Sequence, residues 1–278
     1  MKFVLSRKGA DSQFGGKPSP VLPDGTMLSL PIPEQNTAGV MFDSNRKFED
    51  LALRGFSGLS GYCHLDPDIR KELYKSVPEN WVPCFGQCDA AQTHLSNNEI
   101  GAGDVFLFFG LFQKVDANFN YTGKPFHALW GYMQVDKVIS DPEEIKEYSW
   151  HPHAQKRYQD KSVTNNTLYV GSEFLSFGEG KLPGYGVFNW DDRLALTKKD
   201  SDCLTHWDYE SIPWVNKESG QCNMTYHTAE SSFCPEYFQS ASRGQEFVIT
   251  ESATPVVEKR LLEILLKEPI SKVLALSC

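Results

Sequence analysis

The sequence lacks any apolar segment long enough to cross a membrane. Its longest apolar runs lie at residues 105–112 and 261–266, whereas a membrane-spanning helix needs roughly 20 apolar residues. A signal peptide is also missing, because the apolar start at residues 1–7 is short and leads directly into a polar stretch at residues 8–17. We therefore expect a cytoplasmic protein that has no membrane partner.

The sequence also lacks an excess of positive charge. It carries 27 Lys and Arg residues against 36 Asp and Glu residues, which gives a formal net charge of -9. Proteins that grip duplex nucleic acid through many phosphates depend on clustered cations, so the charge argues against this mode of binding. A pocket for a nucleotide or a single flipped base needs few cations and remains an open interpretation.

A disulfide framework is absent as well. The seven cysteines show no even, close spacing, and we expect them to be free thiols. Cys84 and Cys88 have a CxxxC spacing, but no second pair of matching spacing accompanies them. A structural zinc site is therefore disfavoured.

Several catalytic and nucleotide-binding motifs are missing too. The sequence has no GKS or GxGxxG phosphate loop, no GxSxG elbow and no HExxH helix, so P-loop, dinucleotide-binding, serine hydrolase and zincin classes have no support. No internal repeat stands out, which argues against solenoids and propellers.

What is present indicates a folded α+β protein with a largely antiparallel sheet or a small barrel-like core. Hydrophobic residues make up 40% and aromatic residues 13% of the chain, enough for one core in a single domain over residues 1–278. Apolar, aromatic-rich runs predict strands at residues 3–5, 105–109, 111–115, 128–135, 167–170, 185–188 and 246–250. Helical spacing predicts peripheral helices at residues 68–76, 90–95 and 255–266.

The N-terminal segment, residues 1–36, is rich in proline and glycine after its first strand. Prolines donate no backbone hydrogen bond, so they exclude a central strand here. The apolar residues 27–32 favour a long ordered loop that wraps over a surface.

The pattern His64-x-Asp66-x-Asp68 is the best local candidate for chemistry. In an extended segment these three side chains project to one side, where imidazole and carboxylates can bind a divalent metal or transfer protons. The alternative is that Asp66 caps the helix expected at residues 68–76, Asp68 complements its dipole and His64 lies in solvent. The spacing alone leaves both interpretations open.

Other polar residues could complete a site. Proline between His151 and His153 should keep that segment extended, so both imidazoles are candidate metal ligands, and either one could join His64 and Asp66 in a 2-His-1-carboxylate arrangement. His94 is a further candidate catalytic residue. Arg7 and Lys8, followed by Asp11 near a glycine turn, are candidates for phosphate or substrate binding. A solvated turn and an exposed histidine loop are the alternatives.

Taken together, these motifs carry a resemblance. The segments that carry it are Ser6-Arg7-Lys8-Gly9 with Asp11-Ser12, Gly16-Lys17-Pro18-Ser19-Pro20, Asp24-Gly25, residues 29–33, 64–68, Gly86-Gln87, residues 90–95, residues 103–110 and 151–153. The chain resembles the third family of nucleotide modification-associated domains, a family linked to phage and bacterial systems that make modified bases. Ala10 departs from the aromatic residue expected after Arg-Lys-Gly.

The resemblance implies an enzyme of nucleotide or DNA base hypermodification. Its implied partners are a nucleotide or DNA base as substrate and other base-modification enzymes. On this basis His64, Asp66, Asp68 and His94 are expected to be catalytic. For a metal cofactor, the mixed set of imidazoles and carboxylates fits Fe(II) or another divalent transition metal better than calcium. Two alternatives are a non-catalytic reader of modified bases, with an aromatic cage near Phe108, Trp130 and Tyr132, and a metal-dependent enzyme that acts on a peptide or a small metabolite.

Overall fold

The computed structural model describes residues 1–11, 15–34, 46–159, 163–227 and 229–266. Its α-helices are α1 (Asp89–Asn97), α2 (Pro142–Lys146) and α3 (Thr254–Leu266). Its strands are β1 (Phe3–Arg7), β2 (Ser19–Val21), β3 (Ile32–Pro33), β4 (Arg46–Lys47), β5 (Tyr62–His64), β6 (Cys84–Gln87), β7 (Val105–Val115), β8 (Tyr121–Ile139), β9 (Thr167–Gly171), β10 (Tyr185–Val187), β11 (His206–Trp207), β12 (Val215–Asn216), β13 (Gln221–Cys222), β14 (Phe238–Gln239) and β15 (Glu246–Ile249). Short 3-10 helices occupy Phe48–Asp50, Lys71–Leu73, Pro152–Ala154, Lys156–Gln159, Asp192–Leu194, Tyr209–Ser211, Glu230–Ser232 and Glu251–Ala253.

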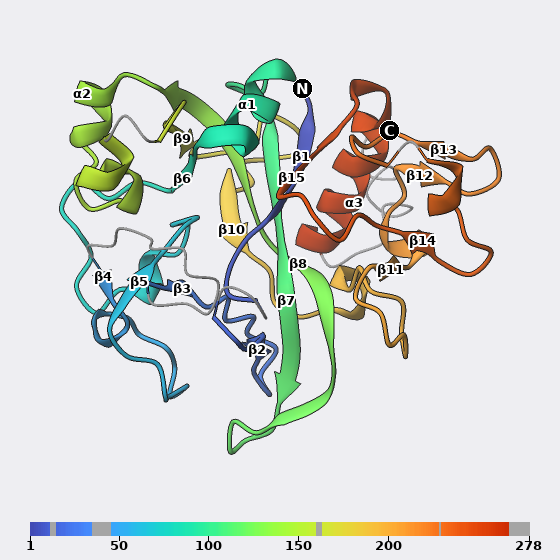
Figure 1. Ribbon diagram of the computed structural model, residues 1–278, viewed down its shortest axis with the longest axis horizontal. Helices are drawn as coiled ribbons and strands as arrows, with labels where there is room; N and C mark the ends of the chain where they lie inside the picture. Colours follow the sequence, from blue (N-terminus) through green and yellow to red (C-terminus); the bar gives the residue numbers. More distant parts are fainter. Residues whose placement is uncertain (12–14, 35–45, 160–162, 228, 267–278) are drawn as a thin grey trace.

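One 8-stranded sheet organises the molecule, and its main path runs β15-β1-β7-β8-β9-β6. The long hairpin of β7 and β8 crosses the whole molecule (Figure 1). β1 runs parallel to β7 and antiparallel to β15, and β9 joins β8 to β6 through antiparallel pairs. The sheet curls into a half-barrel, so the predicted α+β class with a mainly antiparallel, barrel-like core is confirmed.

The curl brings the two ends of this strand path together. Gln87 on β6, at one end, donates a hydrogen bond from Nε2 to Glu246 Oε1 on β15, at the other end, over 2.6 Å. On β6, the ring of Phe85 stacks on Tyr169 and packs edge-on against Phe106. The site described below lies at this seam.

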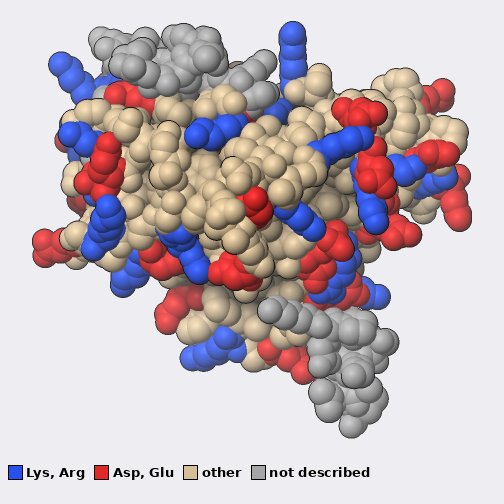
Figure 2. Space-filling view, turned by 90° about the horizontal axis from the view of Figure 1, so that it is seen from below, with Lys and Arg blue, Asp and Glu red and all other residues tan. Residues whose placement is uncertain are grey.

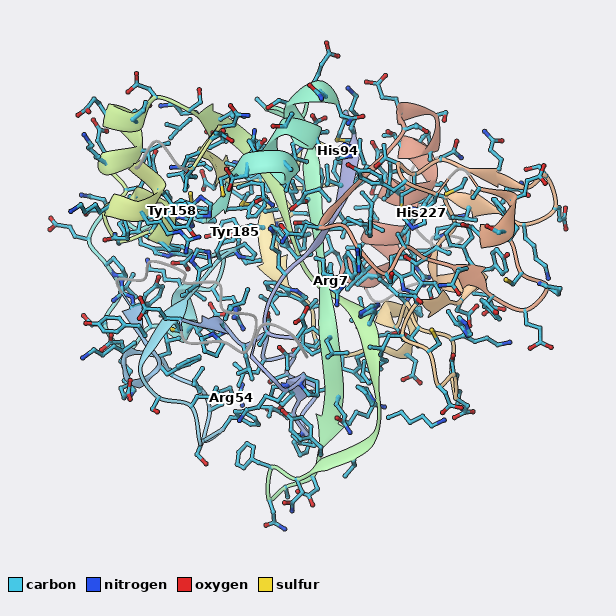
Figure 3. The ribbon with its side chains drawn as sticks, viewed as in Figure 1. Arg7, Arg54, His94, Tyr158, Tyr185 and His227 are labelled. Atoms are coloured by element: carbon cyan, nitrogen blue, oxygen red, sulfur yellow. The ribbon has the colours of Figure 1, made fainter. Side chains whose placement is uncertain are left out.

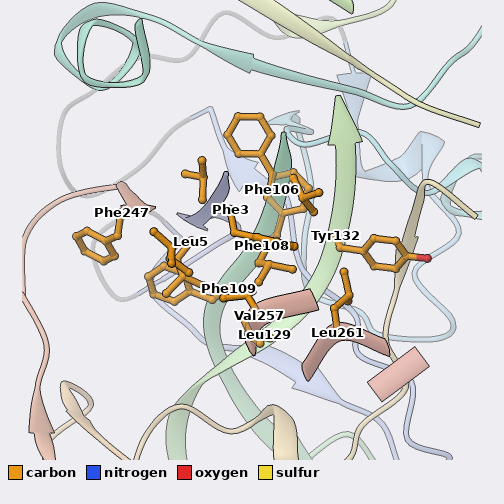
Figure 4. Close-up of a cluster of buried hydrophobic side chains, with 14 of the residues drawn as sticks. Phe3, Leu5, Phe106, Phe108, Phe109, Leu129, Tyr132, Phe247, Val257 and Leu261 are labelled. Carbon is orange, nitrogen blue, oxygen red and sulfur yellow. The ribbon is translucent and has the colours of Figure 1, made fainter. Parts of the chain in front are cut away.

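The core is aromatic because β7 and its neighbours contribute runs of phenylalanine. The β7 residues Phe106, Phe108 and Phe109 are at most 1% exposed, and α3 covers part of the sheet through Val257 and Leu261 (Figure 4). Burial of such side chains stabilises the fold by about 1.5 to 3 kcal/mol each.

Two local predictions are wrong. The segment at residues 68–76 forms a three-residue 3-10 helix, Lys71–Leu73, instead of an α-helix, because the backbone of Asp68 pairs in both directions with Cys84. Likewise, Pro152 starts a buried 3-10 helix, Pro152–Ala154, so the segment from His151 to His153 is neither extended nor exposed. The ordered N-terminal segment is seen in β1, β2 and β3, although residues 12–14 and 35–36 lie outside the described residues.

None of the helices within the described ranges combines the length and the apolar character needed to cross a membrane.

A buried histidine in the core should make stability depend on pH. Burial lowers the pKa of His127 on β8 to about 3, helped by the charge of Arg7. In the unfolded chain this histidine has a pKa of about 6.5 and becomes protonated as the pH falls, whereas in the native state it stays neutral down to about pH 3. The protein therefore loses stability as the pH falls from about 6.5 toward 3. Between about pH 7.5 and about pH 5, the free energy of unfolding should fall by about 2 kcal/mol more in the wild type than in His127→Asn.

Urea unfolding of both proteins over this range measures the effect. The difference between the two proteins should be constant above about pH 7, where a neutral imidazole is expected in both states. A difference that stays unchanged down to about pH 5 would contradict the prediction.

Candidate functional site

A polar cavity of about 470 Å³ lies at the seam of the half-barrel. Its wall is formed by several parts of the chain: the end of β1, the segment that follows β5, strand β6, the first turn of α1, the region from His153 to Tyr158, and β15. Arg7, His94 and Tyr158, which line the cavity, come from three separate parts of the chain (Figure 3). Segments far apart in sequence thus meet in one place.

Three potential metal ligands share one wall of this cavity. His64, Asp66 and His153 each offer a ligand atom, and these atoms lie within 4.8 Å of one another. His64 is the last residue of β5, where Ile32 of β3 is its neighbour in the sheet. The chain then runs alongside β6, which places Asp66 next to Gly86. The group has the 2-His-1-carboxylate composition typical of non-haem iron sites.

The two oxygens of Asp66 face different partners. Oδ1 accepts the backbone N–H of Gly86 over 2.7 Å and lies 3.3 Å from His151 Nε2, whereas Oδ2 lies 4.0 Å from His153 Nε2. Burial alone would raise the pKa of this carboxyl, but the close approach of His151 and the Lys8 cation hold it well below its usual range. Asp66 is therefore an ionised carboxylate with Oδ2 directed to the neighbouring histidine.

The ring of His153 is held so that one nitrogen is available as a ligand. Its Nδ1 lies 2.8 Å from Asn166 Oδ1, and Asn166 Nδ2 donates to the His153 carbonyl over 3.0 Å, which fixes the orientation of the amide. Nδ1 therefore carries the proton, and Nε2 keeps its lone pair. Burial lowers the pKa of His153 to about 3, so the imidazole is in the neutral, metal-binding form at neutral pH.

His151, the other residue predicted as a ligand, lies outside the group of three. It is fully buried, and its Nδ1 accepts the backbone N–H of His153 over 3.2 Å. The proton must then sit on Nε2, which faces Asp66. His151 is thus arranged to orient the carboxylate.

Position 86 requires glycine because the ring of His153 lies very close to its backbone. A Cβ atom there would lie 2.3 Å from Cγ and Cδ2 of His153, a separation that real Cβ atoms do not tolerate. The same ring also stacks on Tyr158, with centroids 4.2 Å apart, so it has little room to move.

Asp68 is placed apart from the cavity. Its carboxylate accepts hydrogen bonds from the Tyr74 hydroxyl and from Trp81 Nε1, and burial raises its pKa to about 6. Together with the missing α-helix, this geometry removes the helix-capping interpretation of Asp66 and Asp68. Similarly, His64 is 5% exposed and is not a solvated loop residue.

The residues predicted to bind phosphate have partners within the protein. Arg7 pairs with Asp11 over 3.2 Å, and Lys8 pairs with Glu246 over 3.1 Å. Arg7 and Lys8 line the cavity. His94 also lines it, but through a different wall, where Nε2 lies 3.1 Å from Thr225 Oγ1.

Sequence reasoning did not name four residues that complete the site: Glu246, Gln87, Tyr158 and Asn166. Gln87 entered only as part of the Gly86-Gln87 segment that carries the resemblance. Glu246 left one trace in the sequence, since it is a charged residue at the start of the apolar strand Glu246–Ile249. Tyr158 and Asn166 left none, because their roles come from neighbours that the fold supplies.

Fold and site together define a class of protein, a curled half-barrel with a His–Asp–His group on the wall of a polar cavity. Residues 2–250 match the family described as nucleotide modification associated domain 3, and the chain belongs to this family. The resemblance inferred from the sequence is thereby confirmed. Neither a curated protein nor a solved structure shows a significant match.

Proposed function

We propose that this protein is a metal-dependent enzyme that modifies a nucleotide or a nucleobase. The observation that carries the proposal is the group of His64, Asp66 and His153 on the wall of the cavity. Family membership associates the chain with nucleotide modification, and the cavity adds cationic residues, Arg7 and Lys8, near the candidate ligands.

The residues fit a divalent transition metal such as Fe(II) better than calcium, because two imidazoles accompany the carboxylate. Bonds of about 2.1 Å to nitrogen and oxygen ligands require ligand atoms that now lie up to 4.8 Å apart to move closer together. When bound, the metal would supply a Lewis acid or redox centre. The protein's own contribution is to keep His153 neutral through burial, to direct its Nε2 through Asn166, and to orient Asp66 through His151 and Gly86.

The structure disfavours the reader alternative in the form that the sequence suggested. Phe108, Trp130 and Tyr132 are at most 3% exposed and belong to the core, so they offer no cage to a ligand. The face shown in Figure 2 mixes Lys and Arg with Asp and Glu, so the described residues of this face offer no basic patch to a duplex.

Metal removal combined with a ligand substitution tests the proposal. We expect metal-free protein and His64→Ala to leave nucleotides and DNA unchanged, while Fe(II)-loaded wild type produces altered nucleosides that mass spectrometry detects. His206→Ala is the matched control, since that ring stacks on Tyr237, with centroids 3.7 Å apart, and is not among the cavity-lining residues. Activity in metal-free protein would refute the role of the metal, and modification of a peptide or metabolite alone would refute the substrate class.

A further inference from the structure

A second polar cluster lies in the same cavity and has no part in holding a metal. Its centre is Glu246 on β15, which is 2% exposed. Three donors converge on one of its oxygens, Oε1: Ser6 Oγ at 3.0 Å, Gln87 Nε2 at 2.6 Å and Lys8 Nζ at 3.1 Å. This oxygen is therefore saturated by the protein.

The other oxygen of Glu246 has no such partners. Oε2 is buried and accepts no hydrogen bond from any residue that the structure describes. Leaving a buried carboxylate oxygen unsatisfied is costly, and such an atom calls for an explanation. Because Glu246 lines the cavity, a ligand in the cavity is the natural source of the missing donor.

Lys8 supplies a hydrogen-bond donor beside this acceptor. An ammonium group has three N–H bonds, of which the ion pair with Glu246 uses one. The face of Phe85, 4.4 Å from Nζ, fixes the position of the cation. Lys8 also lowers the pKa values of Asp66 and Glu246, both of which burial raises, so its charge acts on both clusters in the cavity.

The rim of the cavity offers a flat partner for a planar ligand. Tyr226 is 60% exposed although it is a large aromatic residue, and it lines the cavity. Its ring lies 4.6 Å from that of His94. Exposed rings at the edge of a polar cavity provide stacking surfaces for nucleobases.

We propose that Glu246 selects the substrate by accepting an N–H from the Watson–Crick edge of a nucleobase, while Lys8 donates to the acceptor next to that N–H. The inference rests on the proposed nucleotide substrate, and it further specifies that the protein recognises the Watson–Crick edge of the base. Base pairing occupies this edge, so the substrate is a mononucleotide, a single strand or a base flipped out of a duplex. Gln87 and Ser6 are positioning residues that hold the carboxylate.

The test combines a substitution with a change in the ligand. Binding of nucleoside monophosphates is measured by calorimetry, and each nucleotide is compared with its analogue methylated at the Watson–Crick N–H, for example thymidine and N3-methylthymidine monophosphates. In Glu246→Gln, an amide N–H replaces Oε2, while the remaining oxygen still accepts from Ser6 and Gln87. We expect the substitution to weaken binding of the preferred nucleotide by roughly 10-fold to 100-fold.

Methylation of the nucleotide should weaken binding to the wild type by a similar factor and should have little further effect in Glu246→Gln. Glu236→Gln is the matched control, since Glu236 pairs with Lys198 over 3.0 Å and is not among the residues that line the cavity. If Glu246→Gln fails to fold, the comparison of methylated and unmethylated nucleotides in the wild type still tests whether the protein recognises the Watson–Crick N–H.

Equal affinity for the methylated and unmethylated forms of every nucleotide would overturn the inference, and so would the absence of any nucleotide binding. Each result is distinguishable from failure of the metal proposal, because these measurements need no metal. Short single-stranded and duplex oligonucleotides, used in the same assay, separate a mononucleotide substrate from a base within a strand.

Discussion

Asp66→Asn is expected to bind Fe(II) at least roughly 100-fold more weakly than the wild type. Loss of a residue that merely orients a ligand costs about 10-fold to 100-fold in metal affinity, and here a ligand is lost. The substituted side chain keeps nearly the same shape. Its oxygen can still accept from Gly86 and His151, which contact Oδ1 in the wild type, while an uncharged NH₂ group replaces Oδ2. Equilibrium dialysis under anaerobic conditions, followed by metal analysis, measures the change.

Asp68→Asn is the control for this substitution. It removes a buried carboxylate two positions away that is bonded to Tyr74 and Trp81 and lies outside the group of three. We expect this variant to bind the metal as the wild type does. Equal affinities of Asp66→Asn and wild type would show that the metal does not bind at this group.

Gly86→Ala is expected to lower the free energy of unfolding by about 3 kcal/mol, at the upper end of the usual cost of overpacking. The new methyl group would lie 2.3 Å from two ring atoms of His153, and Tyr158 stacks on the same ring. Displacement of the ring moves Nε2 away from Asp66, so the metal affinity should fall at least roughly 10-fold as well. Urea unfolding and equilibrium dialysis measure the two effects.

Gly101→Ala provides the matched comparison. A Cβ at this loop position meets nothing within 4 Å, so both stability and metal affinity should stay close to those of the wild type. A Gly86→Ala protein as stable as Gly101→Ala, with unchanged metal affinity, would show that the approach of the His153 ring is less tight than the structure places it.

Much of the fold could be predicted from the sequence because strands and helices leave local patterns. The strands predicted at residues 105–109 and 111–115 fall within the single strand β7, and the one predicted at 128–135 falls within β8. The amphipathic pattern at residues 255–266 corresponds to α3. The prediction failed at residues 68–76, where helical spacing was outweighed by backbone pairing with β6. Pairing between distant strands leaves no periodic trace in a single sequence.

The candidate site was predicted in part. His64, Asp66 and His153 were recognised as polar residues in loops, and the structure brings them within 4.8 Å of one another. Their division of roles was not predictable. In His151, Nδ1 accepts the backbone N–H of His153, so its proton sits on Nε2, whereas in His153 Nδ1 donates to Asn166 Oδ1 and leaves Nε2 free for a metal. Asp68 differs from Asp66 in having Tyr74 and Trp81 as partners.

The sequence by itself determined the family, the sheet-rich α+β character and the residue types available for chemistry, because composition, periodicity and linear motifs are local properties. The tertiary structure decided which of those residues act together. Curling of the sheet carries Gln87 to Glu246 across 159 positions of the chain. The same closure places Lys8 beside Glu246, in the cavity that the group of His64, Asp66 and His153 also lines. Long-range contacts of this kind depend on how distant strands pair and how the core packs. Neither can be predicted from the local pattern of neighbouring residues.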